Sequence, residues 1–255
     1  MIINVAGCYG SKSKLMNLVT FIISNKVAVD CGNLFAKEVN REEIEHILVT
    51  HSHMDHLQDL PFFIDEIPFN KNRKSPLTVY GNDEVIQTLK NHIFNGTVWP
   101  ELKNFKMANG EDAVILKRLE EGKLLRLSNL TVYPLKANHT VKTFGFAIFE
   151  ENKGILISGD TYKCKQMWNL VKNENRIKAV FIDVSYPSSM VDLSRKAKHY
   201  CVSELKKDLE ENNISKELPI YAYHLKFPFV EEIKEELSKL KWNIKVLSDG
   251  KTVEV

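Results

Sequence analysis

The stretch VTHSHMDHLQDL, residues 49–60, places three histidines and two aspartates directly after an apolar run. These polar residues are His51, His53, Asp55, His56 and Asp59. A packed interior does not accommodate so many polar side chains, because each one needs a compensating partner when it is buried. Imidazole and carboxylate groups are also common ligands of divalent metals. The stretch therefore predicts a metal site and not an ordinary core segment.

The spacing within this stretch indicates how two ions are held. In an extended chain His51 and His53 point to the same side, so their imidazoles can share one ion. Asp55 and His56 follow as the chain turns into a helix expected to begin near Leu57, and they would face a second ion. A single histidine near a strand end is usually a surface or core residue, but that explanation is weak for the pattern H-x-H-x-D-H.

Two metal ions need more ligands than this stretch supplies, and three later residues end apolar runs of strand length. His139 follows TVYPLKAN, Asp160 ends GILISGD, and a third residue, His224, lies in IYAYHL. Taken singly, Asp160 fits a cap of the next segment and the two histidines fit exposed positions. Taken together they complete two ligand sets that share the Asp160 carboxylate: His51, His53 and His139 for one ion, and Asp55, His56 and His224 for the other. Ions in such pairs lie about 3.5–4 Å apart.

Short β-branched runs recur along the chain, and helical stretches separate the later ones. The expected strands are 2–7, 19–24, 27–32, 46–50, 78–81, 131–137, 144–150, 154–160, 179–185, 220–225 and 244–247. Helices are expected at 82–95, at 202–212 and around Pro228, which stands in a first-turn position. This order predicts the α/β fold class, with two mixed β-sheets flanked by helices in an αββα sandwich. We expect a single domain over 1–255 with an irregular insertion at about 92–130.

Charge and cysteine content narrow the classes of partner. The chain has 35 Lys+Arg against 33 Asp+Glu, and the lysines are scattered, so the sequence gives no reason to expect a nucleic-acid partner. Cys8, Cys31, Cys164 and Cys201 form no C-x-x-C pair, which predicts reduced thiols. No signal-peptide pattern or membrane-spanning run is visible, so we expect a soluble, cytoplasmic protein with no membrane partner.

The motifs together resemble the metallo-β-lactamase superfamily of αββα hydrolases. The resemblance rests on H-x-H-x-D-H, a later lone His, the Asp in SGDT, the His in YHLK, and the early VAVDCG. It spans the whole chain and implies that Asp30 orients the ligand loop and does not bind metal.

Three further segments resemble class II cyclic-nucleotide phosphodiesterases. They are HIFNGTVWPEL (92–102), FIDVSYPSS (181–189) and LSRKAKHYCVSELKKDL (193–209). The sequence departs from that family at Asp183, where Glu is usual. It departs again after His199, where Tyr-Cys-Val replaces Leu-Thr-Pro, and after the metal motif, where Gln58 and Asp59 replace a common Gly.

The resemblance implies a dinuclear metal-dependent phosphodiesterase that hydrolyses 3′,5′-cyclic nucleotides (cAMP or cGMP) to 5′-monophosphates. The expected nucleophile is a metal-bound hydroxide, because a metal pair lowers the pKa of bound water towards 7. His199, oriented by Asp183, is the expected general acid, and Asp55 is assigned to catalysis as well as to the metal. We expect two divalent ions, with Zn²⁺ favoured and Mn²⁺ or Fe²⁺ as alternatives.

Four residues are candidates for contact with the substrate. Phe94 and Trp99 lie in the insertion and could stack on a nucleobase, while Tyr162 and Ser185 could reach a phosphate. Aromatic side chains in an insertion equally fit packing on its own core or on a second subunit, which leaves a homodimer open.

Three other functions are compatible with parts of the pattern. Another phosphodiester hydrolase or a ribonuclease Z-like nuclease uses the same ligands, but tRNA processing calls for a basic arm, and residues 82–130 are not rich enough in Gly, Lys and Arg. A thioester or lactone hydrolase would not need Asp183 and His199. A non-catalytic nucleotide-binding scaffold would be expected to lose ligands, whereas all seven are present.

Overall fold

Residues 1–255 are described by a computed structural model, in which the chain forms two seven-stranded sheets. The strands of the first sheet are β1 (Ile2–Gly7), β2 (Thr20–Ile23), β3 (Val27–Val29), β4 (His46–Leu48), β5 (Leu77–Gly81), β6 (Val114–Arg118) and β14 (Lys251–Glu254). The strands of the second are β7 (Leu125–Leu127), β8 (Leu130–Lys136), β9 (Phe144–Glu150), β10 (Lys153–Ile157), β11 (Ile177–Asp183), β12 (Ile220–Tyr223) and β13 (Ile244–Val246).

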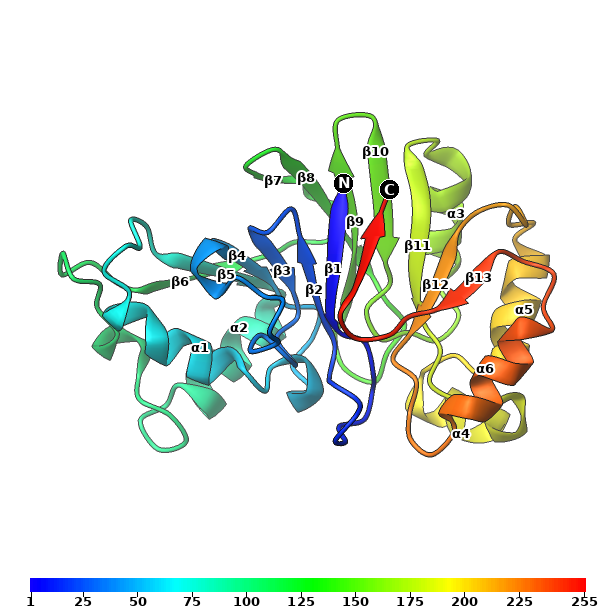
Figure 1. The fold of residues 1–255 in the computed structure, drawn as a ribbon, viewed down its shortest axis with the longest axis horizontal. Helices are drawn as coiled ribbons and strands as arrows, with labels where there is room; N and C mark the ends of the chain where they lie inside the picture. Colours follow the sequence, from blue (N-terminus) through cyan, green and yellow to red (C-terminus); the bar gives the residue numbers. More distant parts are fainter.

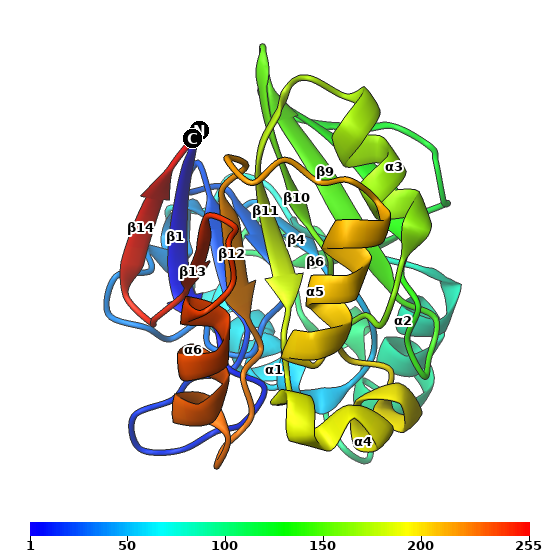
Figure 2. The same cartoon turned by 90° about the vertical axis from the view of Figure 1, so that its right-hand side faces the viewer.

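The helices are α1 (Leu60–Glu66), α2 (Asp83–Thr88), α3 (Lys165–Asn173), α4 (Val191–Ala197), α5 (Val202–Glu211) and α6 (Val230–Ser238). Short 3-10 turns lie at Arg41–Glu43, Met54–His56, Ile67–Phe69, Leu102–Asn104 and Ser188–Met190, and a π-helical turn lies at Leu89–Ile93. Helices α1 and α2 lie on the outer side of the first sheet, and α3, α5 and α6 lie on the outer side of the second (Figure 1 and Figure 2). The predicted αββα sandwich of two mixed sheets is confirmed.

The strand order is β14-β1-β2-β3-β4-β5-β6 in the first sheet and β13-β12-β11-β10-β9-β8-β7 in the second. Strands β3 to β6 pair in parallel, and so do β10 to β13. Both β8 and β10 run antiparallel to β9, so they share one direction. The carboxyl ends of these strands therefore collect at one edge of the sandwich, where ligands bind in open α/β sheets.

Side chains of the first sheet alternate between two apolar layers, because successive residues of a strand face opposite sides. In β2, Phe21 and Ile23 belong to the core between the sheets, while Ile22 belongs to the core beneath α1 and α2. Phe21 meets the second sheet edge-on, with its ring centroid 5.5 Å from that of Phe181 and 5.2 Å from that of Tyr223. Because both faces of this sheet are covered, the strands read as continuous apolar runs.

The structure corrects several expected boundaries. The segment expected as an insertion at 92–130 ends in two strands, β6 and β7, each at the edge of a sheet. Their residues are largely half-buried or exposed, so they lack the apolar signature of the central strands. The helix expected near Leu57 begins at Leu60, and α6 begins two residues after Pro228. No helix has the length and apolar character needed to cross a membrane.

The helix expected at 82–95 is shorter than its polar–apolar pattern suggests. It starts as predicted, because the Asn82 side chain accepts a hydrogen bond from the Val85 amide at 3.1 Å and caps the first turn. The α-helical part ends at Thr88 and continues as the π-helical turn.

Candidate metal centre and active site

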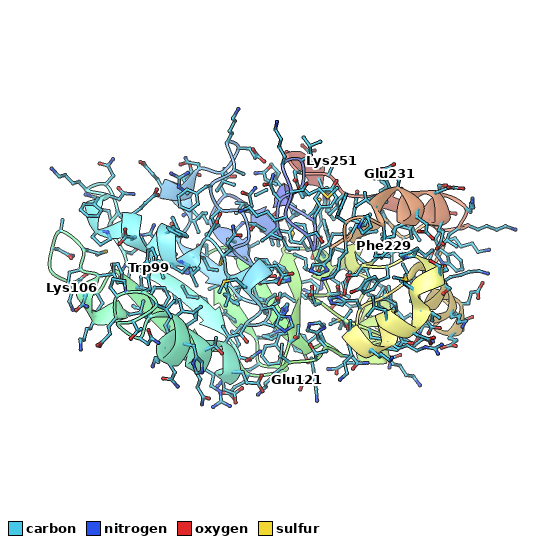
Figure 3. The ribbon with its side chains drawn as sticks, turned by 90° about the horizontal axis from the view of Figure 1, so that it is seen from below. Trp99, Lys106, Glu121, Phe229, Glu231 and Lys251 are labelled. Atoms are coloured by element: carbon cyan, nitrogen blue, oxygen red, sulfur yellow. The ribbon has the colours of Figure 1, made fainter.

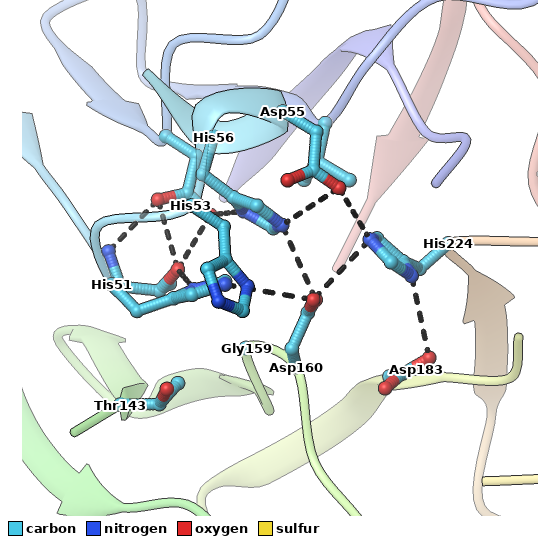
Figure 4. Close-up of polar contacts among 12 residues, drawn as sticks. His51, His53, Asp55, His56, Thr143, Gly159, Asp160, Asp183 and His224 are labelled. Atoms are coloured by element: carbon cyan, nitrogen blue, oxygen red, sulfur yellow. Dashed lines mark hydrogen bonds and ion pairs between the residues drawn. The ribbon is translucent and has the colours of Figure 1, made fainter. Parts of the chain in front are cut away.

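Four strand ends deliver the predicted metal ligands to one place. The chain leaves β4, passes His51 and His53, and forms the 3-10 turn that carries Asp55 and His56. The segments after β8, β10 and β12 bring the remaining three residues, His139, Asp160 and His224. Figure 4 shows how the side chains of His51, His56 and His224 converge on the Asp160 carboxylate. The structure thus gathers all seven residues that the sequence selected.

Two ligand sets share Asp160, as the sequence predicted. Within each set the potential ligand atoms lie within 4.8 Å of one another; the sets are His51, His53, His139 and Asp160, and Asp55, His56, Asp160 and His224. The Asp160 carboxylate faces both sets, with Oδ2 3.6 Å from Nε2 of His51 in the first set and Oδ1 3.3 Å from Nε2 of His56 in the second. A carboxylate in this position can bridge two cations.

The chemistry of the donor atoms fits divalent cations. Nε2 of His51, Nε2 of His56 and Oδ1 of Asp160 are buried and make no hydrogen bond. Buried polar atoms without a partner are costly and rare, so three of them facing one another call for a shared partner. A cation bound among them would satisfy all three atoms.

Two hydroxyl groups hold the outer nitrogens of metal-facing histidines. Nδ1 of His51 lies 2.9 Å from Oγ1 of Thr50, and the Thr50 hydroxyl lies 2.9 Å from Oδ2 of Asp30. With Nε2 as the ligand atom, Nδ1 carries the proton, donates it to Thr50, and the hydroxyl donates to Asp30. Such partners fix the tautomer and the ring orientation of a metal-binding histidine.

The same arrangement occurs on the second sheet. Nδ1 of His224 lies 2.8 Å from Oγ of Ser185, and the Ser185 hydroxyl donates to Oδ1 of Asp183 at 2.7 Å. Thr50 and Ser185 were not recognised as positioning residues from the sequence. The place of Thr50, directly before the first histidine of the motif, is the only local signal, and Ser185 was assigned to the substrate.

Asp30 has the orienting role that the superfamily resemblance implies. Its Oδ2 lies 2.7 Å from Nδ1 of His56, and its Oδ1 accepts a hydrogen bond from the Thr50 amide at 2.8 Å. Asp30 is buried, and its φ of 60° lies in the left-handed region. A non-glycine residue in this region costs energy and is often found at functional sites.

Burial sets the protonation of the first ligand set. It lowers the pKa of His51 and of His53, and it lowers the pKa of His139 to about 4. These imidazoles are therefore neutral near pH 7 and offer a lone pair to a metal. Burial would raise the pKa of Asp160, but the neighbouring His224 and His56 hold it well below its usual value. The bridging carboxylate is thus charged.

His199 and Asp183 form a close pair beside the ligands. Nδ1 of His199 lies 2.7 Å from Oδ2 of Asp183, and the ring stacks on that of His224 with centroids 5.1 Å apart. Burial would lower the pKa of His199, but the Asp183 carboxylate outweighs it and the pKa is raised. The shorter Asp183, in place of the usual Glu, therefore still reaches the histidine.

Asp183 holds other groups in place and does not itself offer a metal site. Together with His199, His224 and Asp160 it forms a third group of ligand-type atoms within 4.8 Å. However, Oδ1 already accepts from Ser185, and Oδ2 accepts from the Thr161 amide at 3.0 Å as well as from His199. The ring of His224 presents Nδ1 to this carboxylate, while its Nε2 lies 3.3 Å from Oδ2 of Asp55 and 3.3 Å from Oδ2 of Asp160.

Gly10 allows the loop after β1 to lie directly against His224. A Cβ placed on Gly10 would lie 2.5 Å from Nδ1 and Cε1 of the His224 ring, which is closer than real Cβ contacts allow. The His224 amide donates to the carbonyl of Cys8 at 2.7 Å, and the φ of His224 is 65°. The opening loop therefore supports this ligand in a left-handed conformation that few side chains adopt.

Two of the four predicted substrate contacts are corrected by burial. Phe94 is buried in the core beneath α1 and α2, with its ring edge-on to Phe105 at 6.4 Å, so it cannot stack on a base. Ser185 is fully buried beneath His224 and is engaged with Asp183. It positions side chains and cannot reach a phosphate.

The other two predicted substrate contacts already have protein partners. The Tyr162 hydroxyl donates to Oε2 of Glu204 on α5 at 2.7 Å, which uses its proton within the protein. Trp99 packs edge-on against Phe62 of α1, with ring centroids 5.0 Å apart. Trp99 is half-buried, so its packing role is the one that the structure supports.

Sequence comparison finds one matching family and several relatives. The model of the family "cAMP phosphodiesterases class-II" matches residues 13–216. A 3′,5′-cyclic-nucleotide phosphodiesterase of Candida albicans is 32% identical over 96 residues, covering 38% of this chain and 20% of the relative. A probable 3′,5′-cyclic-nucleotide phosphodiesterase of Yersinia pestis is 26% identical over 211 residues, 74% of this chain and 59% of the relative.

A ribonuclease Z of Lactobacillus delbrueckii is also similar, with 26% identity over 157 residues that cover 57% of this chain and 48% of the relative. The chain thus spans less than two thirds of the length of each of these relatives.

Structure comparison supports the fold. Yeast PDE1 superposes with a TM-score of 0.78 at 17% identity, covering 98% of both chains. The metallo-beta-lactamase fold protein YhfI of Bacillus subtilis superposes with a TM-score of 0.76 at 17% identity, covering 99% of both chains. With the family match over residues 13–216 and the seven converging ligands, the chain belongs to the class-II cAMP phosphodiesterase family and has the metallo-β-lactamase fold.

Proposed function

We propose that this protein is a dinuclear metal-dependent phosphodiesterase that hydrolyses 3′,5′-cyclic nucleotides, such as cAMP and cGMP, to 5′-monophosphates. The observation that carries the proposal is the position of the His199–Asp183 pair beside two ligand sets that share Asp160. The ligand sets supply a place for reaction at phosphorus, and the pair supplies a proton for the group that leaves.

Seven side chains would hold the ions, and the two His–hydroxyl–Asp chains would keep their rings oriented. Divalent cations bound there would lower the pKa of a water molecule and neutralise negative charge on the phosphoryl oxygens. Histidine and carboxylate donors suit Zn²⁺, with Mn²⁺ or Fe²⁺ as alternatives. The polypeptide's part is to orient the phosphate, exclude excess water and move a proton.

Proton donation to the leaving group is the step that His199 would perform. Its Nδ1 donates to Asp183, which leaves Nε2 to donate to the 3′ oxygen of the substrate as the P–O bond breaks. A sugar alkoxide is a poor leaving group, so proton donation accelerates its departure. The raised pKa of His199 keeps this proton available near neutral pH.

A thioester would not need this arrangement, because a thiolate leaves without assistance. Ribonuclease Z-like hydrolysis of an RNA phosphodiester is a second candidate, supported by the similarity to the ribonuclease Z of Lactobacillus delbrueckii over 157 residues. Both candidates break the bond between phosphorus and a ribose oxygen, and they differ in the size of the substrate.

The test is a substrate panel. Purified protein loaded with Zn²⁺ or Mn²⁺ is incubated with cAMP, bis-p-nitrophenyl phosphate, a precursor tRNA and a thioester. We expect turnover of cAMP to 5′-AMP and of the nitrophenyl ester. Cleavage of tRNA without cleavage of cAMP would transfer the assignment to the ribonuclease, and hydrolysis of the thioester alone would refute both.

A further inference from the structure

A groove of about 930 Å³ opens beside the metal centre, with His139 in its wall. Most of the rest of its lining comes from the loop between β8 and β9, the end of β6 and the start of α3. Lys198 also lines the groove, directly before His199 in the chain. The groove therefore lies on the side of the centre where the proposed general acid stands.

Positive charge dominates this groove although the whole chain is nearly neutral. Six basic residues line it: Arg118, Lys136, Lys142, Lys163, Lys165 and Lys198. Lys142 forms an ion pair with Asp83, and Lys163 lies 3.5 Å from carboxylate oxygens of Glu204 and Glu211. The other four basic side chains make no ion pair.

The acidic residues of the groove do not cancel this charge. They are Glu84, Glu120 and Glu121, and Glu120 is already paired with Lys123 at 3.6 Å. Glu84 accepts a hydrogen bond from the Lys142 amide at 3.1 Å, and Glu121 accepts one from Gln166 at 3.2 Å. Four cations that form no ion pair thus face two carboxylates, which favours an anionic ligand.

Lys198 joins the groove to the metal centre through two contacts with one ligand. Its carbonyl lies 3.1 Å from Nδ1 of His139, and its ammonium donates to the His139 carbonyl at 3.1 Å. Since Lys198 precedes His199, an anion in the groove would lie on the side of the oxygen that leaves. Attack on phosphorus would proceed from the other side, because the attacking and leaving oxygens lie in line.

A 3′,5′-cyclic nucleotide has one phosphate, and the metal centre takes it. We infer that the groove binds a second phosphate, attached on the leaving-group side of the reacting one, so that the site also accepts linear phosphodiesters whose leaving nucleotide has a further phosphate. The inference rests on the proposed function and extends its substrate class. The oxygen of a water molecule bonds to phosphorus and the water releases one proton to solvent. The bond to the 3′ oxygen breaks, that oxygen takes a proton from His199, and solvent returns a proton to His199.

The ligands for the test are three nucleotides that a phosphodiesterase does not hydrolyse. 5′-AMP has one phosphate, adenosine 3′,5′-bisphosphate adds a second at the 3′ position, and ADP adds a second on the 5′ side. Isothermal titration of the metal-loaded protein gives a Kd for each. We expect the bisphosphate to bind about tenfold more tightly than AMP. The affinity of ADP should exceed that of AMP by a much smaller factor.

Two triple variants distinguish binding in the groove from a general effect of the protein's net charge. R118Q/K136Q/K165Q removes three unpaired cations of the groove, and we expect it to reduce the preference for the bisphosphate to about twofold. R126Q/K172Q/K251Q makes the same change in net charge outside the groove and should keep the preference. In Figure 3, Lys251 lies on the opposite edge of the molecule from Glu121, which lines the groove.

Hydrolysis of cAMP by the same proteins keeps the two proposals distinct. If cAMP is hydrolysed but the bisphosphate is not preferred, the inference about the groove is wrong and the proposed function is retained. A preference that the groove variant removes supports the groove even if cAMP is not turned over. Equal gains for ADP and the bisphosphate overturn the assignment to the leaving-group side.

Discussion

Oδ2 of Asp183 lies 2.7 Å from Nδ1 of His199, at the rim of a buried cluster of metal-ligand side chains. The other oxygen of Asp183 reaches a metal ligand, His224, through the hydroxyl of Ser185. One carboxylate therefore positions both the proposed acid and a histidine of the proposed second metal site. This connection keeps the proton donor and the metal centre in a fixed relation.

Replacing the proposed acid should affect substrates according to their leaving group. We expect His199→Gln to lower kcat for cAMP by about 10²–10⁴-fold, because the alkoxide then leaves without a proton. The kcat for bis-p-nitrophenyl phosphate should fall much less, since nitrophenolate is a good leaving group. Both rates are measured at saturating metal, with the exposed His92→Gln as control. Equal losses for the two substrates would remove His199 from the proton transfer.

Removing the shared carboxylate should reduce metal content. Asp160 contacts both ligand sets, so Asp160→Asn weakens both sites and we expect loss of at least one ion together with loss of cAMP hydrolysis. Elemental analysis after reconstitution and dialysis measures the ions per chain. Asp192→Asn, at an exposed position on α4, should bind as much metal as the wild type. Full occupancy in Asp160→Asn would contradict the bridging role.

The glycine beside His224 offers a test of loop packing. Gly10→Ala places a methyl group 2.5 Å from the His224 ring, so the ring must shift within the proposed second metal site. Mutating a residue that holds a metal ligand in place typically lowers metal affinity by about 10–100-fold. Competition with a chelating dye measures the affinity, and Lys12→Ala in the same loop is the control. Unchanged affinity would show that the loop yields and the ring does not.

Glu204 should contribute a pH-dependent part of stability. Burial would raise its pKa, but hydrogen bonds from Tyr162, Lys207 and Arg195 lower it to about 2. A carboxyl with a lowered pKa in the folded state stabilises the fold above its unfolded pKa, and this contribution is lost as the pH falls towards 2.

We therefore expect Glu204→Gln to lower the free energy of unfolding by about 1–2 kcal/mol at pH 6, and the difference from wild type to shrink towards pH 3. Urea unfolding at both pH values measures it. Glu211→Gln removes a carboxylate that is 64% exposed and should change the free energy little. A difference that is constant with pH would mean that the charge of Glu204 is not what stabilises the fold.

The sequence by itself determined the candidate metal ligands and the fold class. The spacing of His51, His53, Asp55 and His56 is local, so it could be interpreted without coordinates. The distant ligands His139, Asp160 and His224 each followed an apolar run, and parallel strands carry such positions to the same edge. Apolar runs also predicted the central strands, because those are covered on both faces.

Tertiary structure alone decided which way several side chains point and which residue each one meets. Phe94 packs in the core, Ser185 lies beneath His224, and the Tyr162 hydroxyl donates a hydrogen bond to Glu204. The direction of a side chain beyond a strand end depends on the backbone angles of the loop, and its partner comes from a segment far away in sequence. Local spacing fixes neither, so the supporting contacts and the basic groove emerge only once the two sheets are packed together.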